Sequence, residues 1–252
     1  MAGHSKWATT KHRKAAQDKK RSALFSKLSR IVFVAAKEGD ANPDNNAALA
    51  AAIAKAKSYS LPKDKIDAAI AKAHASGADG AAWSEIVYEG YGPDGVAVYV
   101  EALTDNRNRT ASDVRSTFSK AGGNLGTNGS VAFQFERKGE IVIDKQSDVD
   151  EDDLMLLVAE AGGDDMEVAG DAIVVTTAPT SVMAVKRALE EAGVAVRGAE
   201  LVMEAVNAQV TTDDTAKKVM RLVDRLEELD DVQNVYHTMD LTEEQMSALD
   251  DE

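Results

Sequence analysis

The chain lacks cysteine, contains few aromatic residues and prolines, and has no long apolar run. Its 252 residues include no Cys, four Pro and 5% aromatic residues. Without cysteine there is no disulfide, no thiol nucleophile and no thiolate metal site, which suits a reducing compartment. The most apolar stretch, IVFVAA at 31–36, is far shorter than the roughly 20 apolar residues of a membrane helix. We therefore expect a cytoplasmic protein with no membrane partner.

Positive charge is also scarce overall, but it is concentrated at the start of the chain. The formal net charge is -14, yet residues 1–30 contain nine Lys or Arg and one acid, a net charge of +8. Residues 31–252 therefore carry -22, and residues 151–252 alone hold 25 acids against seven basic residues. A basic block on an acidic chain is typical of an interaction tail for a polyanion.

Helical periodicity dominates the first third of the sequence. Leu24, Leu28, Ile31, Val32 and Ala35 share one helix face, and Gly39 follows as a stop signal. Asn42 and Pro43 are expected to cap and begin a second helix that runs to Lys57, and Pro62 begins a third. These three helices predict a small bundle.

Residues 95–240 alternate short apolar strands with helices. The segment 138–197 reads as strand, helix, two strands, helix and strand, which is the ferredoxin-like order. Its flanks supply VAVYVEAL (96–103), a helix from Thr110, SVAFQF (130–135), ELVMEAV (200–206), a helix over 215–229 and VQNVYHT. We predict an α+β protein with an N-terminal three-helix domain and two ferredoxin-like α/β domains, the second inserted into the first. The expected divisions are a basic arm at 1–21, a helical bundle at 22–80, a discontinuous domain at 81–137 plus 198–240, an inserted domain at 138–197 and an acidic tail at 241–252.

The basic arm has the composition of a nucleic-acid contact. Lysine and arginine bind phosphates by releasing condensed counterions, without regard to sequence. Trp7 lies between His4 and His12 and can stack on an unpaired base. The alternative is a solvated tail in which Trp7 packs on the helical bundle.

A second candidate contact is the turn TDNRNRT at 104–110. A strand end followed by a helix start can direct Arg107, Arg109 and backbone N–H groups at a phosphate. In the alternative, this is a polar turn in which Asp105 pairs with an arginine. The nearby GGNLGTNGS lacks the Gly-Lys-Ser/Thr ending of a nucleotide loop, so it predicts a tight connection with glycines at positive φ.

Catalytic and metal-ligand patterns are sparse. The four histidines, His4, His12, His74 and His237, do not have the spacing of a zinc site. The many acids fall at helix ends and in loops, where they stabilise helices and keep the chain soluble. We expect no catalytic residues, no metal, no cofactor and no small-molecule substrate.

Four motifs together resemble one known family. MAGHSKW with KHRKAAQDKKR, LPKDKIDAAI, YEGYGPDGVAVYVEALTDNRNRT and GGNLGTNGSVAFQF are similar to the YebC/PmpR family, which includes a mitochondrial translational activator of cytochrome oxidase subunit one. The resemblance covers nearly the whole chain and implies three domains. One departure is WATTKH, where Thr9 and Thr10 replace the Asn and Ile more usual in the family.

The resemblance implies a set of nucleic-acid contacts, which are Lys6, Trp7, Lys11, His12, Arg13, Lys14, Lys19, Lys20 and Arg21, with Arg107 and Arg109 as a weaker case. Family members are described as DNA-binding transcriptional regulators. Others act on the ribosome as translation factors that relieve stalling at proline-rich sequences. The sequence thus predicts a regulator of gene expression whose partner is DNA or, alternatively, ribosomal or transfer RNA together with basic ribosomal proteins.

Overall fold

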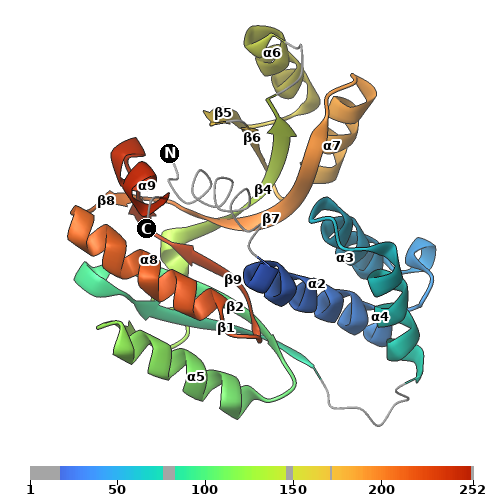
Figure 1. The fold of residues 1–252 in the computed structure, drawn as a ribbon. Helices are drawn as coiled ribbons and strands as arrows, with labels where there is room; N and C mark the ends of the chain where they lie inside the picture. The colour runs from blue at the N-terminus through green and yellow to red at the C-terminus, as the bar shows by residue number, and fades with distance from the viewer. Residues whose placement is uncertain (1–17, 76–82, 146–149, 171, 251–252) are drawn as a thin grey trace. The chain divides into compact units, whose positions relative to one another are not determined.

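The computed structural model describes residues 18–75, 83–145, 150–170 and 172–250. They form two compact units (Figure 1). The outer unit is residues 18–135 with 205–250, and the inserted unit is residues 136–204. The chain therefore leaves the outer unit after Phe135 and returns to it at Ala205. A finer division of the outer unit near residue 80 stays a prediction.

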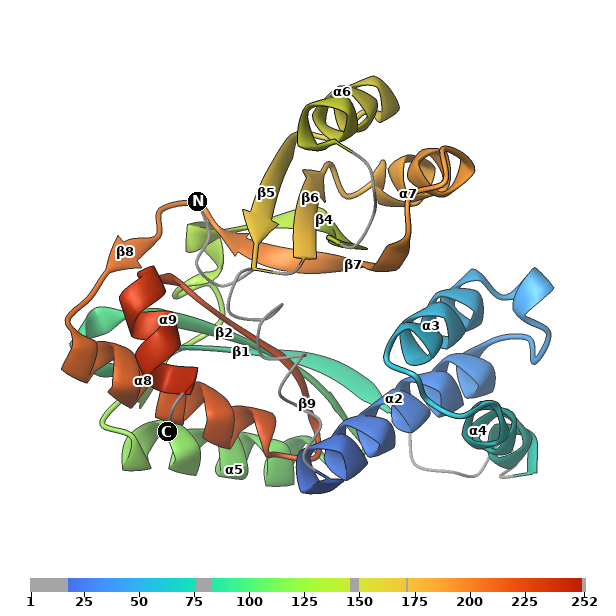
Figure 2. The same cartoon turned by 45° about the horizontal axis from the view of Figure 1, so that its top comes forward.

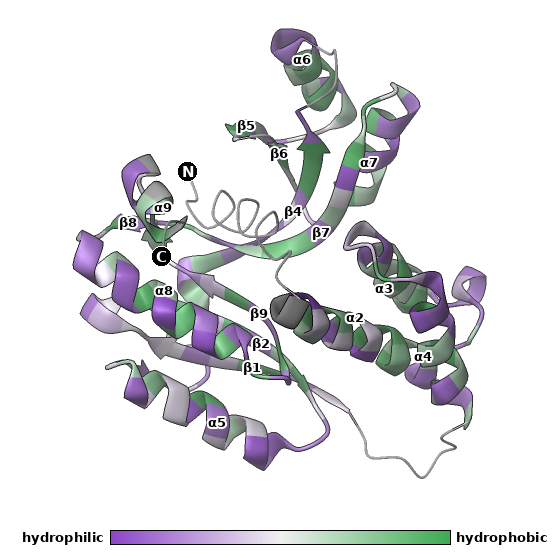
Figure 3. Cartoon of the chain, viewed as in Figure 1, coloured by the Kyte–Doolittle hydropathy of each residue, from purple (hydrophilic) through white to green (hydrophobic). Residues whose placement is uncertain are grey.

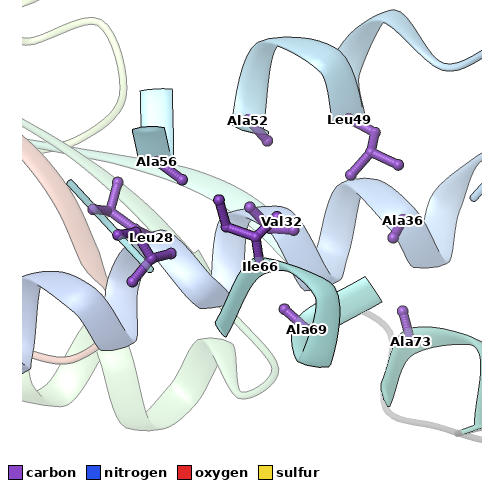
Figure 4. Close-up of a cluster of buried hydrophobic side chains, with 10 residues drawn as sticks. Leu28, Val32, Ala36, Leu49, Ala52, Ala56, Ile66, Ala69 and Ala73 are labelled. Carbon is purple, nitrogen blue, oxygen red and sulfur yellow. The ribbon is translucent and has the colours of Figure 1, made fainter. Parts of the chain in front are cut away.

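Three α-helices at the start of the described chain pack around a core of small side chains. They are α2 (Asp18–Glu38), α3 (Ala47–Ser58) and α4 (Lys63–Ala75). Leu28 and Val32 of α2 share one buried cluster with Leu49 of α3 and Ile66 of α4, and Val32 lies beside Ile66 (Figure 4). Leu61 and several alanines complete the cluster. The expected three-helix bundle is therefore present.

The start of α3 corrects one expectation. Asn42 and Pro43 begin a 3₁₀ turn, η1 (Pro43–Asn45), and α3 starts after Asn46. The Asn46 Oδ1 accepts a hydrogen bond from the Leu49 N–H at 3.0 Å, while its Nδ2 donates to the carbonyl of Ala35. Asn46 therefore caps α3 and ties it to the end of α2, a role that Asn42 cannot fill from its place in the turn.

The outer sheet contains four strands in the order β3-β1-β2-β9. They are β1 (Ser84–Tyr91), β2 (Ala97–Thr104), β3 (Asn124–Leu125) and β9 (Val232–His237). Two helices, α5 (Arg107–Lys120) and α8 (Asp213–Glu227), pack side by side on one face of this sheet (Figure 2). The apolar side chains of α8 are buried and alternate with polar ones along its length (Figure 3).

Strand β1 was not predicted, and it takes the place expected for residues 200–206. It pairs antiparallel with β2 through η2 (Pro93–Gly95), where Asp94 and Gly95 have φ of 54° and 77°. Residues 200–206 were predicted as a strand of the outer domain, but they largely continue β7 (Val196–Ala205) of the other sheet. Residues 200–206 read as a strand in either sheet, so the sequence pattern alone does not say which sheet they join.

The inserted unit has the predicted ferredoxin-like topology. Its elements are β4 (Phe135–Asp144), α6 (Glu151–Ala161), β5 (Asp165–Ala169), β6 (Ala172–Thr177), α7 (Val182–Glu191) and β7, with strand order β5-β6-β4-β7. Both helices pack on the sheet over a core of Ile, Val and Leu. The predicted α+β class, with helices first and antiparallel sheets after them, is confirmed.

Two further segments differ from expectation. SVAFQF, predicted as a strand, forms η3 (Ala132–Gln134) before β4 begins. The predicted acidic tail contains α9 (Glu243–Asp250), where Thr242 and Gln245 exchange hydrogen bonds as in a capping box. The short strands β8 (Gln209–Val210) and β10 (Met239–Asp240) pair in parallel.

Candidate nucleic-acid interface

Most predicted arm contacts lie outside the described residues. Lys6, Trp7, Lys11, His12, Arg13 and Lys14 belong to this group, so their roles stay predictions. Lys19 and Lys20 lie in the first turn of α2. Arg21 follows them and is exposed, with its guanidinium carbon 5.2 Å from the centre of the Phe25 ring. The described part of the chain therefore begins with a basic helix end.

Beyond Arg21, a groove of about 930 Å³ runs between α2 and α4. Three aromatic rings line it, from Phe25 and Phe33 of α2 and from Trp83, which precedes β1. All three side chains are half-buried. Phe33 and Trp83 meet edge to face, with ring centres 6.4 Å apart and planes at 70°. The groove floor is thus partly aromatic.

The groove is also strongly basic. Its lining cations are Arg21, Arg30, Lys37, Lys65 and Lys72. Asp105 is the single acid among the lining residues that the structure describes. Lys72 Nζ lies 6.0 Å from the centre of the Phe33 ring, and the Arg30 guanidinium carbon lies 5.4 Å from that of Trp83. Cations above aromatic faces attract the ring quadrupoles, which holds these rings and cations together.

Two cations of α2 donate to backbone carbonyls at and just after the end of α8. The Lys27 ammonium donates to the carbonyl of Glu227, and the Arg30 guanidinium donates to that of Asp230. Carbonyls at a helix C-terminus lack partners within the helix and carry partial negative charge. Lys27 satisfies the last carbonyl of α8, and Arg30 bonds the segment that follows this helix, so both side chains are engaged within the protein.

Asp231 is the centre of a polar network beneath the TDNRNRT turn. It is only 7% exposed, and its carboxylate accepts hydrogen bonds from Thr104 (3.1 Å), Thr110 (2.7 Å) and Arg109 (2.7 Å), and from Arg30 at 3.3 Å. Burial alone would raise the pKa of Asp231, but the bonds from Arg109, Thr110 and Thr104 outweigh it and lower that pKa. Asp231 therefore holds α2, β2 and α5 together as a carboxylate.

The two arginines of the turn differ in their surroundings. Arg109 also donates to Asp105 at 2.9 Å, and hydrogen bonds from it to Asp231 and Asp105 raise its pKa. Arg107 is exposed, and its Nη2 donates to the Ser84 hydroxyl at 3.1 Å. The geometry matches the polar-turn alternative for Arg109, whereas Arg107 faces solvent. Phosphate contact by these two arginines stays a prediction.

Helix α5 starts earlier than Thr110. Asn106 is its cap, and the Asn106 Oδ1 accepts from the Arg109 N–H at 3.1 Å. Thr110 therefore lies inside the first turn, where its buried hydroxyl bonds Asp231. Asn106 thus satisfies one of the backbone N–H groups that have no partner within the first turn of α5.

The glycine-rich segment 122–130 is a connection that encloses a carboxylate of the chain itself. Gly122 and Gly129 have φ of 78° and 85°, as predicted. The Glu89 carboxylate accepts bonds from the N–H groups of Gly129 (2.6 Å), Val131 (2.8 Å) and Ala132 (2.7 Å). Burial opposes the charge on Glu89, but these three bonds outweigh it and lower its pKa. Val131 and Ala132 therefore cannot donate to a strand, which explains why SVAFQF is not one.

The described residues contain neither a metal-binding cluster nor a membrane-spanning helix. Among them, no group of three or more His, Asp or Glu residues is placed to hold a metal ion. Nor does any described helix combine the length and apolar character needed to cross a membrane.

The fold and the basic groove together define an α+β protein with a cationic helical end. The family model described as "TACO1/YebC protein N-terminal domain" matches residues 5–76, and that for the "TACO1/YebC second and third domain" matches residues 83–239. The chain therefore belongs to the TACO1/YebC family, and the resemblance seen in its motifs is confirmed.

Relatives match over their full length. A Bifidobacterium animalis protein is 50% identical over 252 residues, covering 100% of both chains, and a Rubrobacter xylanophilus protein is 51% identical over 99% of both. Each is named "Probable transcriptional regulatory protein". The crystal structure of a conserved hypothetical protein, Aq1575, from Aquifex aeolicus has a TM-score of 0.81 and 41% identity, with 90% of this chain and 93% of that chain covered.

The groove was missed by reasoning from the sequence, although part of its signal was visible. Phe25 and Phe33 are eight residues apart on α2, and Lys65 and Lys72 are seven apart on α4. Both spacings place side chains on one helix face. What the sequence could not give is that these two faces border the same groove.

Proposed function

We propose that the chain is a cytosolic, non-enzymatic regulator of gene expression that acts by binding nucleic acid, as a DNA-binding transcriptional regulator. The observation that carries the proposal is the concentration of nine cations against one acid in residues 1–30 of a chain whose net charge is -14. The names of the full-length relatives support it. Repulsion between phosphates and the acidic remainder would direct binding to the basic end.

A second candidate function is a ribosome-associated translation factor that binds ribosomal or transfer RNA and relieves stalling at proline-rich sequences. One observation favours it over promoter recognition. Between residues 21 and 30 of α2, the exposed side chains are Arg21, Ser22 and Ser26, because Lys27 and Arg30 donate to the carbonyls of Glu227 and Asp230. Direct reading of a major groove usually requires several base-contacting side chains on one exposed helix face.

Crosslinking in cells followed by sequencing of the recovered nucleic acid tests both functions. The chain is compared with Lys11→Ala/Arg13→Ala/Lys14→Ala and with a matched control, Lys145→Ala/Lys186→Ala/Arg187→Ala, which removes the same charge from the inserted unit. Promoter peaks lost only in the arm variant support transcriptional control. Ribosomal and transfer RNA peaks lost in the same way support the translation factor.

Binding in vitro provides the physical counterpart. Each phosphate contact adds about 0.9 to the log-log salt slope on duplex DNA and about 0.7 on a single strand. The arm variant should therefore lower the slope by roughly 2 to 3, while the control should leave it nearly unchanged. Equal slopes for all three proteins would contradict a role for the arm.

A further inference from the structure

We propose that the groove between α2 and α4 binds an unpaired stretch of single-stranded nucleic acid, with bases against its aromatic rings and phosphates on its lysines. This inference rests on the proposed function and names the form of nucleic acid that the site takes. It concerns described residues of the helical end and not the arm, so the two can be tested separately.

The aromatic rings supply the surface for the bases. Phe25, Phe33 and Trp83 line the groove and are half-buried. Phe25 and Phe33 also pack against the helical core around Leu28, Val32 and Ile66, which holds these two rings in place at the groove. Each base offers a π-face, so stacking on such rings tolerates any sequence and changes affinity by about 5- to 150-fold per base. A volume of about 930 Å³ accommodates more than one ring-sized group.

The lysines of α4 supply the charge for the phosphates. Lys65 and Lys72 are both exposed, and both line the groove. Their spacing of seven residues places them on one face, roughly 10 Å apart along the helix. Arg30, by contrast, is tied to Asp230 and Asp231, so it orients Trp83 and does not contact the ligand.

A duplex fits this surface less well than a single strand does. Paired bases are stacked on one another and present only their edges, so the faces of Phe33 and Trp83 would have nothing to stack on. Single strands expose base faces and backbone together, which is the combination of aromatic rings and cations that the groove offers. The Asp105 carboxylate is the one unfavourable charge among the described lining residues, and its ion pair with Arg109 at 2.9 Å reduces its repulsion of a phosphate.

Trp83 fluorescence tests the site directly. The chain has two tryptophans, so Trp7→Phe leaves Trp83 as the sole indole. This variant is titrated with a 12-nucleotide oligouridylate, the matching oligothymidylate, a 12-base-pair duplex and poly-glutamate, with binding followed in parallel by anisotropy of labelled oligonucleotides. We expect both single strands to quench Trp83 and the duplex to leave it unchanged. Stronger quenching by either oligouridylate or oligothymidylate would show which of the two single strands the groove prefers, and either result supports the proposal.

Charge reversal on α4 provides the second arm of the experiment. Lys65→Glu/Lys72→Glu should weaken single-strand binding by about tenfold or more near 0.1 M salt and lower the salt slope by about 1.4. The matched control, Lys57→Glu/Lys63→Glu, makes the same charge change at exposed positions of α3 and α4 that do not line the groove. It should have a much smaller effect.

Three results would overturn the inference. They are an unchanged Trp83 signal while anisotropy reports single-strand binding, equal losses in the groove and control variants, and quenching by poly-glutamate equal to that by oligonucleotides. In each of these cases nucleic-acid binding, and with it the proposed function, still stands. If the unaltered chain binds no nucleic acid in either assay, the proposed function fails together with this inference.

Discussion

The outer unit and the inserted unit close their cores by different means. Eleven of the twelve aromatic residues lie in residues 18–135 and 205–250, whereas residues 136–204 contain none. The outer unit also buries Asp231 and Glu89 as hydrogen-bonded carboxylates. The inserted unit packs Ile, Val and Leu between two helices and a sheet. The outer unit therefore combines apolar cores with aromatic rings and hydrogen-bonded carboxylates, whereas the core of the inserted unit is aliphatic.

The two regions also differ in the sign of their net charge. Residues 1–75 contain 15 basic and 6 acidic residues, whereas residues 136–204 contain 6 basic and 17 acidic ones. The basic region also has aromatic rings at its surface, and the acidic one has none to offer. Under the proposed function, a polyanion would bind the basic end of the chain, since the inserted unit lacks both the positive charge and the aromatic rings.

The aliphatic core of the inserted unit should show the largest effect of a single substitution. Leu154 of α6 is fully buried, so Leu154→Ala should destabilise this unit by about 3 kcal/mol through lost burial and the cavity left behind. Amide exchange in β4 and β6, followed by mass spectrometry, should accelerate about 100-fold. The control is Leu156→Ala on the same helix, where the leucine is 65% exposed.

Both tryptophans lie outside residues 136–204, so tryptophan fluorescence sharpens this test. The urea midpoint measured by fluorescence should stay the same in Leu154→Ala if the two units unfold independently. A clear fall in the fluorescence midpoint of Leu154→Ala would show that the two units unfold together.

Loss of the Asp231 carboxylate should have the next largest effect, and in the outer unit. Asp231→Ala leaves the buried hydroxyls of Thr104 and Thr110 without their acceptor and separates Arg30 from its partner. Arg109 is about half exposed and can be hydrated again, so we expect about 2 kcal/mol, below the usual loss for a broken buried pair.

Urea denaturation followed by tryptophan fluorescence measures this loss. Asp230→Ala is the control, because Asp230 is exposed and bonds Arg30 through its backbone carbonyl, which the substitution retains. It should stay within about 0.5 kcal/mol of the unaltered chain. Similar losses in both variants would mean that the Asp231 network does not stabilise the outer unit.

Lowering the pH should destabilise the outer unit more than the inserted unit, and this is the smallest of the expected effects. The folded pKa values of Asp231 and Glu89 lie below their ordinary values of 3.8 and 4.5, so their stabilisation is complete above about pH 4.5 and is lost as the pH falls through the lowered values. In the inserted unit, burial raises the pKa of Glu204, so protonation there favours the folded state.

The urea midpoint of the outer unit, read by fluorescence, should therefore fall between pH 5 and pH 3 more steeply than that of the inserted unit, read by amide exchange. Asp231→Asn should flatten the fluorescence profile because it removes one of the two titrating carboxylates. An equal slope in this variant would show that Asp231 does not contribute to the pH dependence.

Local patterns in the sequence predicted those parts of the fold that depend on neighbouring residues. The ferredoxin-like unit follows from apolar runs such as AIVVTT, which is β6 at the predicted residues. Strand β1 was not predicted because SEIVYEGY mixes polar and small residues with apolar ones. Its place in the sheet depends on pairing with β2. Likewise, no local signal shows that Glu89 occupies the N–H groups of a loop 40 residues later.

The candidate site was predictable to a smaller extent. Charge density indicated the arm, and the motif TDNRNRT indicated a polar turn, but the bond from Arg109 to Asp231 spans 122 residues. The groove depends on the packing of α2 beside α4 and on Trp83, which lies beyond both helices in the sequence. Such contacts join residues far apart in the sequence, so no local pattern in a single sequence indicates them.

The chain leaves and rejoins the outer unit at neighbouring positions, so the insertion could be removed without separating the two ends that it joins. The Val206 N–H donates to the Gln134 carbonyl at 2.9 Å, so the two ends of the interruption lie side by side. A short turn could join them with little cost in loop closure. A chain shortened in this way should retain the outer unit and with it the basic groove, whose lining residues all lie outside the insertion.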